Sequence, residues 1–290
     1  MERHAYLIQA HKFDYTFKTL LKMIDDTRND IFIHMDKKNK RFNEEEVKKI
    51  IKKSNVFFTE RTSVTWGAYS MINSELLLLK KATSTGKYMY YHLLSGEDLP
   101  IKNQDYIHDF FQKNMGKEFV RFEKKEFAYS DRIKYTYSFQ ELAGRSKNIY
   151  RILGILLIKF QKIINYSKPI YKNIRFQKGT NWFSITDSLA KYVVEKENWI
   201  KETFKNSFCS DEIFLQTIVI NSDYIKNLYH KDFDNNPVAI MRLIDWKRGN
   251  PYIFKKDDLD ELKKSEMLFA RKFNCKVDKS IIDKVYDNFK

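Results

Sequence analysis

Polar side chains follow each of the first four apolar segments of the chain, and together they could hold a charged ligand. His11 follows the first segment, Asp36 the second and Arg61 the third. The fourth segment ends in Ser95–Pro100, which contains Asp98. Because four successive strands of a parallel sheet would deliver these polar groups to the same edge, this combination favours a nucleotide pocket over an ordinary stretch of surface.

The run Ser210–Glu212 is the second place where chemistry could occur. It precedes an apolar-periodic segment at 213–220, and Ser210 is predicted to be the N-cap of a helix there. Spacing alone supports a structural role for Glu212, because acids in a first turn stabilise a helix. A helix start would also hold this carboxylate rigidly, as a catalytic base requires.

Several other chemistries lack their motifs. The sequence contains no GxGxxG and no GxxxxGK[ST], so neither a dinucleotide fold nor a phosphate-loop NTPase is predicted. Cys209 and Cys275 are the two cysteines, which supports neither a disulfide framework nor a zinc site. Asp-x-Asp triplets occur at Asp232–Asp234, in a predicted loop, and at Asp258–Asp260, in a charged predicted helix. Chance surface acids explain both triplets better than a metal site, and no metal is expected.

Alternating strand and helix patterns predict an α/β fold with a mainly parallel sheet. Ligands bind outside the carboxyl ends of the strands in such folds, where the polar groups above stand. No repeat or linker divides the chain, so residues 1–290 are expected to form one domain. The predicted strands are 4–10, 30–35, 56–59, 88–94 and 178–186, and the predicted helices are 14–27, 43–53, 69–82, 213–220, 257–265 and one starting at Asp187.

The net charge of +15 is concentrated in one region. Between Leu142 and Thr186 there are nine basic residues and no acidic one, within a basic insertion at 120–178. An apolar, basic helix is predicted near 152–164. It could bind an anionic membrane surface or the acceptor, or it could simply pack against the core with its lysines in solvent. Nucleic acid ranks below these because no recognised module is present. The nine are Arg145, Lys147, Arg151, Lys159, Lys162, Lys168, Lys172, Arg175 and Lys178.

The start of the chain, Met1–His4, lacks the layout of a signal peptide, and no apolar run reaches the roughly 18 residues that span a bilayer. A cytoplasmic protein is expected, soluble or peripheral on the inner face of the membrane.

Seven segments in fixed order resemble the core-2/I-branching glycosyltransferases, glycosyltransferase family 14, which also includes peptide xylosyltransferases. Coverage runs from residue 5 to about 275, and the region from about 120 to 178 has no counterpart. The segments are Ala5–Lys12, Ile33–Asp36, Val64–Met71, Leu94–Pro100, Gly179–Phe183, Ser210–Glu212 and Leu268–Phe273.

The resemblance implies a GT-A-type fold, an inverting mechanism, a UDP-sugar donor and no divalent metal. It makes transfer of N-acetylglucosamine, of another hexose or of xylose to a glycan hydroxyl the leading hypothesis. Surface polysaccharide or a lipid-linked oligosaccharide of bacterial type is the expected acceptor. A metal-dependent transferase using an Asp-x-Asp triplet, and a non-catalytic glycan- or nucleotide-binding protein, are the alternatives.

The same resemblance implies roles for particular residues. Glu212 corresponds to the catalytic base and Lys272 to a lysine that binds the diphosphate. A second cation is expected in the run 245–249, with Arg248 preferred to Lys247 for its planar fork, and Arg271 either assists or faces solvent.

Other residues are expected to line the donor and acceptor sites. Asp36 corresponds to the acid that contacts uridine, with His11 and Arg61 beside it, and Trp66–Gly67 resembles a loop over the donor. Asp98 is expected either to contact a sugar or to cap a turn. Asn181 and Trp182 are expected on the acceptor side, with a core position as the alternative for Trp182.

Overall fold

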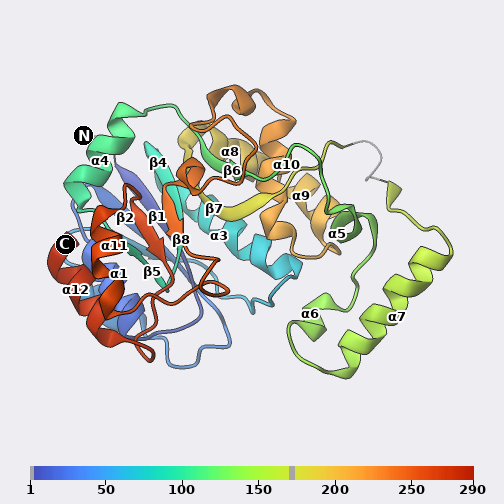
Figure 1. Ribbon diagram of the computed structural model, residues 1–290, viewed down its shortest axis with the longest axis horizontal. Helices are drawn as coiled ribbons and strands as arrows, with labels where there is room; N and C mark the ends of the chain where they lie inside the picture. The colour runs from blue at the N-terminus through green and yellow to red at the C-terminus, as the bar shows by residue number, and fades with distance from the viewer. Residues whose placement is uncertain (1–2, 170–173) are drawn as a thin grey trace.

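The computed structural model describes residues 3–169 and 174–290, and its centre is a six-stranded sheet (Figure 1). The strand order is β3-β2-β1-β4-β7-β6. The first four strands in this order are parallel, whereas β7 is antiparallel to β4 and β6 is antiparallel to β7. The predicted α/β fold with a mainly parallel sheet is therefore confirmed. The strands are β1 (His4–Ala10), β2 (Asn29–Met35), β3 (Asn55–Phe58), β4 (Tyr90–Ser95), β6 (Phe119–Phe122) and β7 (Gly179–Thr186).

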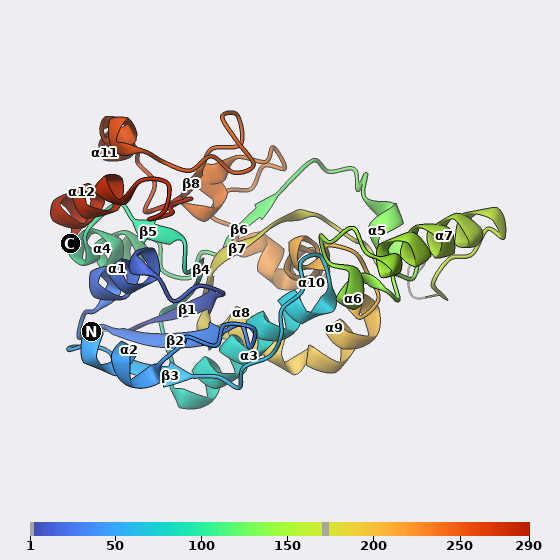
Figure 2. The ribbon, with the colours of Figure 1, turned by 90° about the horizontal axis from the view of Figure 1, so that it is seen from below.

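Both faces of the sheet are buried, which explains why its strands are almost continuously apolar. Side chains alternate along β1: Tyr6 and Ile8 enter one core, and Ala5 and Leu7 enter the other. Figure 2 shows one layer of helices on each side of the sheet. The first layer contains α1 (Tyr15–Ile24), α4 (Gln104–Lys113), α11 (Leu259–Lys264) and α12 (Lys279–Phe289), and the second contains α3 (Tyr69–Thr85), α8 (Asp187–Glu195) and α9 (Glu197–Phe204).

A small second sheet brings the C-terminal part of the chain to the end of β4. Its order is β5-β9-β8, formed by Asp98–Pro100, Phe269–Arg271 and Arg242–Ile244. Asp98 is paired in register with Arg271. Residues about 170 positions apart in the sequence therefore become neighbours beside the central sheet.

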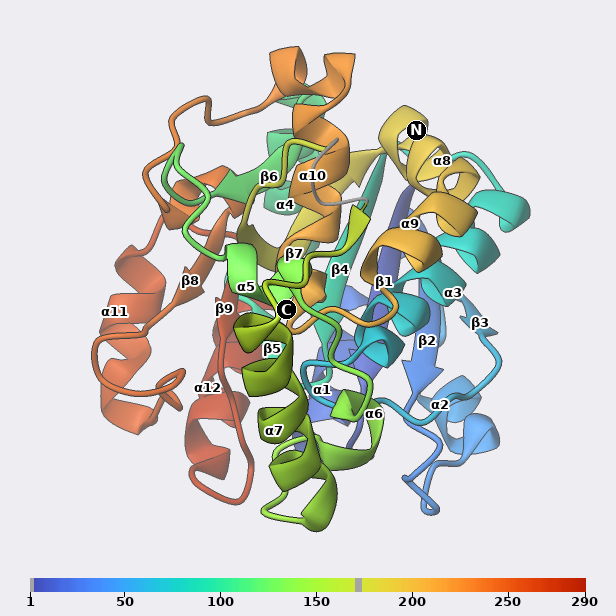
Figure 3. The ribbon, with the colours of Figure 1, turned by 90° about the vertical axis from the view of Figure 1, so that its right-hand side faces the viewer.

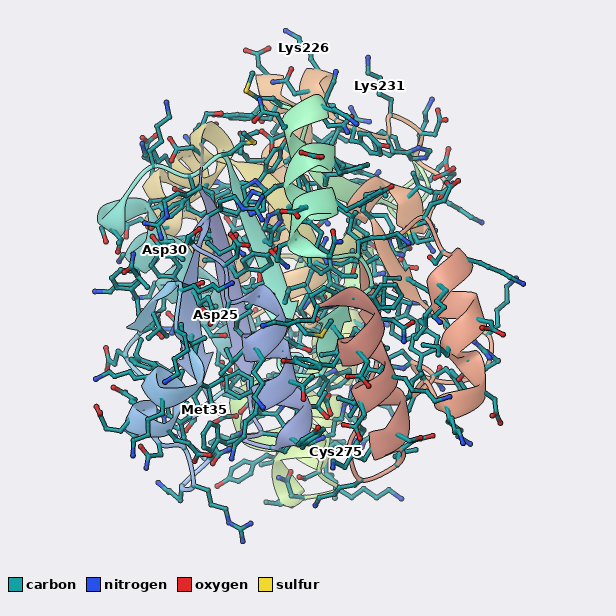
Figure 4. The ribbon with its side chains drawn as sticks, turned by 90° about the vertical axis from the view of Figure 1, so that its left-hand side faces the viewer. Asp25, Asp30, Met35, Lys226, Lys231 and Cys275 are labelled. Atoms are coloured by element: carbon teal, nitrogen blue, oxygen red, sulfur yellow. The ribbon has the colours of Figure 1, made fainter. Side chains whose placement is uncertain are left out.

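The topology places a ligand-binding position between β1 and β4. The chain moves outward from β1 to β2 and β3, whereas β4 lies on the other side of β1, so the strand order reverses there. Clefts in open α/β sheets lie at such a reversal, outside the carboxyl ends of the strands. Figure 4 labels Asp30 near the start of β2 and Met35 at its end, which marks the direction of the parallel strands.

The turn that carries Glu212 differs from the prediction. Ser210–Glu212 form a short 3-10 helix, η2, and α10 (Phe214–Ile220) begins after Ile213. Ser210 is therefore not the N-cap of α10, and this prediction is wrong. Its hydroxyl is buried and has no hydrogen-bond partner among the residues that the structure describes.

The start of β7 needs a glycine because another strand passes very close to it. A Cβ atom on Gly179 would lie 1.7 Å from the carbonyl oxygen of Arg121 in β6. β6 and β7 pair there with an irregular register, between Val120 and Phe122. The absence of a side chain at Gly179 thus allows β6 to join the sheet.

In its described residues, the basic insertion contains three helices beyond β6: α5 (Ser130–Lys134), α6 (Gln140–Ala143) and α7 (Ile149–Ile163). Figure 3 looks onto α7, which lies in front of the rest of the molecule in that view. Lys172 of the basic stretch lies outside the described residues. In the described ranges, no helix combines the length and apolarity needed to cross a membrane.

Candidate active site

Cations and carboxylates converge where β1 and β4 end, at the position that the topology favours. Lys12, just beyond β1, contacts Glu97, just beyond β4. The Nζ of Lys272 lies 2.8 Å from the other oxygen of the same carboxylate. Arg271 Nη1 lies 2.6 Å from the Asp98 carboxylate and also donates to the Ser95 hydroxyl. We call Lys12, Glu97, Asp98, Arg271 and Lys272 the strand-end cluster.

The strand-end cluster has an excess of positive charge. Burial alone would raise the pKa of Glu97, but Lys12 and Lys272 outweigh burial and lower it. Behind the cluster, Arg242 is fully buried, and this burial lowers its pKa to about 9, although Asp98 partly opposes the effect. Within the cluster, three cations thus face two carboxylates, and the Arg242 guanidinium behind them hydrogen-bonds backbone carbonyls. The remaining positive charge suits an anionic group such as a diphosphate.

His11, Asp36 and Arg61 adjoin this cluster at the ends of the neighbouring strands. The amide of Asp36 donates to the carbonyl of Ala10 at 2.8 Å, and the Asn39 side chain donates to the carbonyl of His11 at 3.1 Å. Arg61 donates to the carbonyl of Asp36 at 3.0 Å, so it fixes the loop that carries this acid. Partial desolvation lowers the pKa of His11, which favours the neutral ring.

Trp182 connects the cluster to β7. Its side chain is only 6% exposed and belongs to the core, yet the guanidinium of Arg271 lies 4.6 Å from the centre of its ring. The Trp182 ring therefore packs against Arg271, a residue of the cluster, from the side of the core. Asn181, the preceding residue on the same strand, is half-buried. Because η2 also packs on β7, this strand lies next to both the cluster and Glu212.

Glu212 is held by cations from the basic insertion. Its carboxylate lies 2.8 Å from Arg132 Nη1 and 3.4 Å from Lys178 Nζ, and its side chain is 37% exposed. Arg132 in turn lies over the ring of Tyr129, at 4.9 Å. A carboxylate that is positioned by two cations and is still accessible can accept a proton from a bound hydroxyl.

Trp66 and Gly67 lie beside η2. The carbonyl of Gly67 accepts a hydrogen bond from the amide of Cys209 at 2.9 Å, and Gly67 has a φ of +73°. The ring of Trp66 packs edge-on against Phe208, with 5.7 Å between ring centres. This loop therefore supports the turn that carries the candidate base.

The loop after β8 contains both candidates for the second cation, and their surroundings differ. Arg248 contacts Asp245 and lies 2.7 Å from both Asp258 and Glu261. Its charge is therefore satisfied by one acid of the loop and two acids from the helical segment 256–264. Lys247 is exposed and makes no ion pair among residues 3–169 and 174–290. Tyr252 of this loop accepts a hydrogen bond from the amide of Lys272, which connects the loop to the strand-end cluster.

Both Asp-x-Asp triplets make contacts within their own segments. Asp234 accepts from His230 at 2.9 Å, and Asp258 accepts from Arg248 and from the amide of Lys255. Within the described ranges, no group of three or more His, Cys, Asp or Glu side chains is arranged to hold a metal ion.

Two buried acids, Asp211 within η2 and Glu75 of α3 against it, were not predicted from the sequence. Glu75 of α3 is 0% exposed, and its two carboxylate oxygens have no hydrogen-bond partner in the described part of the chain. Asp211 is also buried, and α3 packs against η2. Burial first, and then repulsion from Glu212, raise the pKa of Asp211 to about 7. Burial and Asp211 raise the pKa of Glu75 well above its usual value.

Glu75→Gln is expected to change how stability depends on pH. An acid whose pKa is raised by folding contributes stability that is full below its unfolded pKa of about 4.3 and is lost as pH rises. The variant removes this loss, so its stability relative to the native chain should rise with pH from the unfolded pKa up to the raised folded pKa of Glu75, with a slope of at most about 1.4 kcal/mol per pH unit. Urea unfolding at pH 5.5 and pH 8.5 measures the difference.

The matched control for that experiment is Glu202→Gln, which changes an exposed glutamate on α9 and should leave the pH dependence unaltered. Parallel stability curves for the Glu75 variant and the native chain would show that the buried carboxyl does not titrate differently in the folded state.

Three further residues of the site were not predicted from the sequence. Lys12 and Glu97 lie in segments that the sequence analysis named, and their positions just after apolar strands could have identified them as site residues. Arg132 comes from the insertion, in a region with no recognisable motif, so nothing in the sequence identified it.

The chain is similar in sequence to one family of known proteins. The family model described as Branch: Core-2/I-Branching enzyme matches residues 4–267. Xylosyltransferase 2 of Rattus norvegicus is 23% identical over 303 residues, covering 97% of this chain and 33% of that protein. Xylosyltransferase sqv-6 of Caenorhabditis briggsae is 21% identical over 290 residues, covering 92% and 34%. The chain thus spans about a third of the length of these relatives.

Among solved structures, the apo form of mouse xyloside xylosyltransferase 1 aligns with a TM-score of 0.38 at 8% identity. The alignment covers 95% of this chain and 99% of that one.

Proposed function

Because the chain belongs to the core-2/I-branching enzyme family and is thus a glycosyltransferase, we propose that it transfers a sugar from UDP to a glycan hydroxyl with inversion and without a metal ion. The observation that carries this proposal is the strand-end cluster. It places an excess of fixed cations at the carboxyl ends of β1 and β4, where a diphosphate would otherwise need a bound cation.

Glu212 acts as the base in this proposal. The acceptor oxygen attacks the anomeric carbon, the bond from that carbon to the β-phosphate oxygen breaks, and Glu212 takes the acceptor proton. Arg132 and Lys178 hold the carboxylate in position before the reaction. UDP leaves with the electron pair of the broken bond, so negative charge grows on its β-phosphate.

Lys272 and Arg271 stabilise this growing charge, together with Lys12. Fixed cations in a partly buried site act more strongly than cations in water, because little solvent has to reorganise. Lys247 is the better second cation from the loop after β8, since Arg248 is already bound to three acids. Asp36 receives the uridine, and His11 and Arg61 border it.

Asn181 and Asp98 complete the sugar side of the proposed site, while Trp182 supports Arg271 from the core. The donor sugar is N-acetylglucosamine, another hexose, or the pentose xylose. The acceptor is a glycan of a surface polysaccharide or a lipid-linked oligosaccharide, reached by a protein at the inner face of the membrane. No resident cofactor takes part.

A thermal-shift series with UDP-sugars, with and without EDTA, tests the proposal. UDP-sugar is expected to raise the melting temperature equally in both conditions, since ligand binding to the folded state stabilises it by mass action. A shift that disappears with EDTA and returns with manganese would replace the proposal with a metal-dependent transferase. Equal shifts without any turnover of donor would indicate a binding protein.

A further inference from the structure

Helix α7 presents an apolar face that nothing in the described structure covers. The face consists of residues spaced three or four apart, so they share one side of the helix. Gln161 is the one residue of α7 that is buried, and it bonds to Thr136. The outer face of α7 is formed by Ile149, Ile152, Leu153, Leu156, Phe160 and Ile163, which are 38–82% exposed.

The flank of α7 that faces α6 and the Trp66 loop carries basic residues together with Ile155 and Ile158. Arg151, Lys159 and Lys162 line a groove of about 670 Å³ between α7, α6 and the loop that carries Trp66. Arg145 lies over the ring of Trp66 at 4.3 Å and adds a fourth cation. Lys162 is paired with Asp131, whereas Arg145, Arg151 and Lys159 make no ion pair among residues 3–169 and 174–290.

The position of α7 leaves its outer face accessible. Figures 1 and 2 show α6 and α7 at one edge of the molecule, at the side away from α11 and α12. The main neighbour of α7 is α6, which is only four residues long. A broad flat surface can therefore reach the helix without meeting the rest of the protein.

We propose that the outer face of α7 enters an anionic lipid bilayer, with the basic residues beside it bound to lipid phosphates. An apolar helix face flanked by arginine and lysine, with no acidic residue between positions 142 and 186, complements such a surface in both polarity and charge. A second copy of this chain fits less well, because it would bring two basic helices together.

Docking through α7 would place the candidate base next to the membrane. Phe208, four residues before Glu212, lines the groove behind α7, and Arg132 lies 5.9 Å from its ring. A lipid-linked acceptor held in the same bilayer would therefore present its glycan close to η2. This last step rests on the proposed function, whereas the docking itself does not.

Co-sedimentation of the full chain with vesicles tests the docking. Vesicles of phosphatidylcholine with about 30% phosphatidylglycerol, a fraction chosen to give a strong negative surface potential, are compared with pure phosphatidylcholine. The native chain is expected to bind the anionic vesicles at least about tenfold more tightly. The double variant Leu156→Glu/Phe160→Glu should lose about tenfold or more in affinity for them.

Two further variants sharpen the result. Arg151→Gln/Lys159→Gln should lose the preference for anionic vesicles while keeping the outer face. Val277→Glu alters an apolar side chain that is 49% exposed at a distant place and should bind as the native chain does. The changed residues of α7 are exposed, so all variants should melt at the native temperature.

Unchanged vesicle binding by the Leu156→Glu/Phe160→Glu variant would overturn the proposal. A second result would also overturn it: light scattering shows that the native chain is a dimer, and the variant becomes a monomer but binds vesicles as the native chain does. In that case α7 would serve self-association. Failure of UDP to stabilise the chain would remove the proposed function and leave the docking result intact.

Discussion

The Glu212→Gln variant is expected to lose between about 10² and 10⁴-fold in kcat, the range typical of removing a positioned general base. Glutamine has nearly the same shape but takes no proton from the acceptor hydroxyl. Arg132 and Lys178 would lose their negative partner, although both have other contacts, with the Tyr129 ring and with Glu123. The turn should therefore persist, and the loss should lie in the chemical step.

Steady-state kinetics together with UDP titration separate this result from a general loss of structure. The dissociation constant for UDP should remain within about threefold of the native value, because the strand-end cluster is unchanged. Glu202→Gln on α9 is the matched control and should retain full turnover. A Glu212→Gln enzyme that turns over normally would show that another group removes the proton.

Local patterns predicted the framework of the fold because they depend on residues close together in the sequence. The first strand was predicted with the boundaries that β1 has, and the predictions for β2, β3, β4 and β7 differ by one or two residues at an end. β6 and the three strands of the small sheet were not predicted. Buried parallel strands are apolar on both faces, and that signal is local. The polar residues at strand ends, among them His11, Asp36 and Asp98, follow directly from the strand boundaries.

The contacts within the site could not be predicted in the same way. Glu97 and Lys272 stand 175 positions apart in the sequence, and they meet because β9 pairs with β5. The ion pairs of Arg248 with Asp258 and Glu261 could not be predicted either, because the chain has to fold back before these acids can contact Arg248. Pairing of this kind depends on tertiary packing.

The failed prediction at Ser210 has a comparable cause. Serine before an apolar-periodic run normally caps a helix. Here the Gly67 carbonyl binds the amide of Cys209, which has a φ of +46°, and Ser210 begins a 3-10 turn above the buried Glu75. Tertiary contacts from the Trp66 loop and α3 therefore override the local cap.

The Lys272→Met variant should show the other large effect, a loss of about 10² to 10³-fold in kcat, comparable with removing one fixed donor from a developing anion. Methionine keeps much of the apolar length of lysine but has no charge for the leaving UDP. Lys12 would remain with Glu97, so that carboxylate would not be left without a cation. Lys276→Met, at an exposed position nearby, is the control and should be neutral.

Repeating these measurements with EDTA and with added manganese tests whether the protein's own cations replace a metal ion. If the protein's own lysines and arginines neutralise the pyrophosphate, the native enzyme should be indifferent to EDTA and to added manganese. The Lys272→Met enzyme should bind UDP more weakly, and Lys272→Arg should recover part of the activity because it restores the charge with a different shape. Unchanged kcat and UDP affinity in Lys272→Met would mean that the strand-end cluster serves the fold and that the diphosphate binds elsewhere.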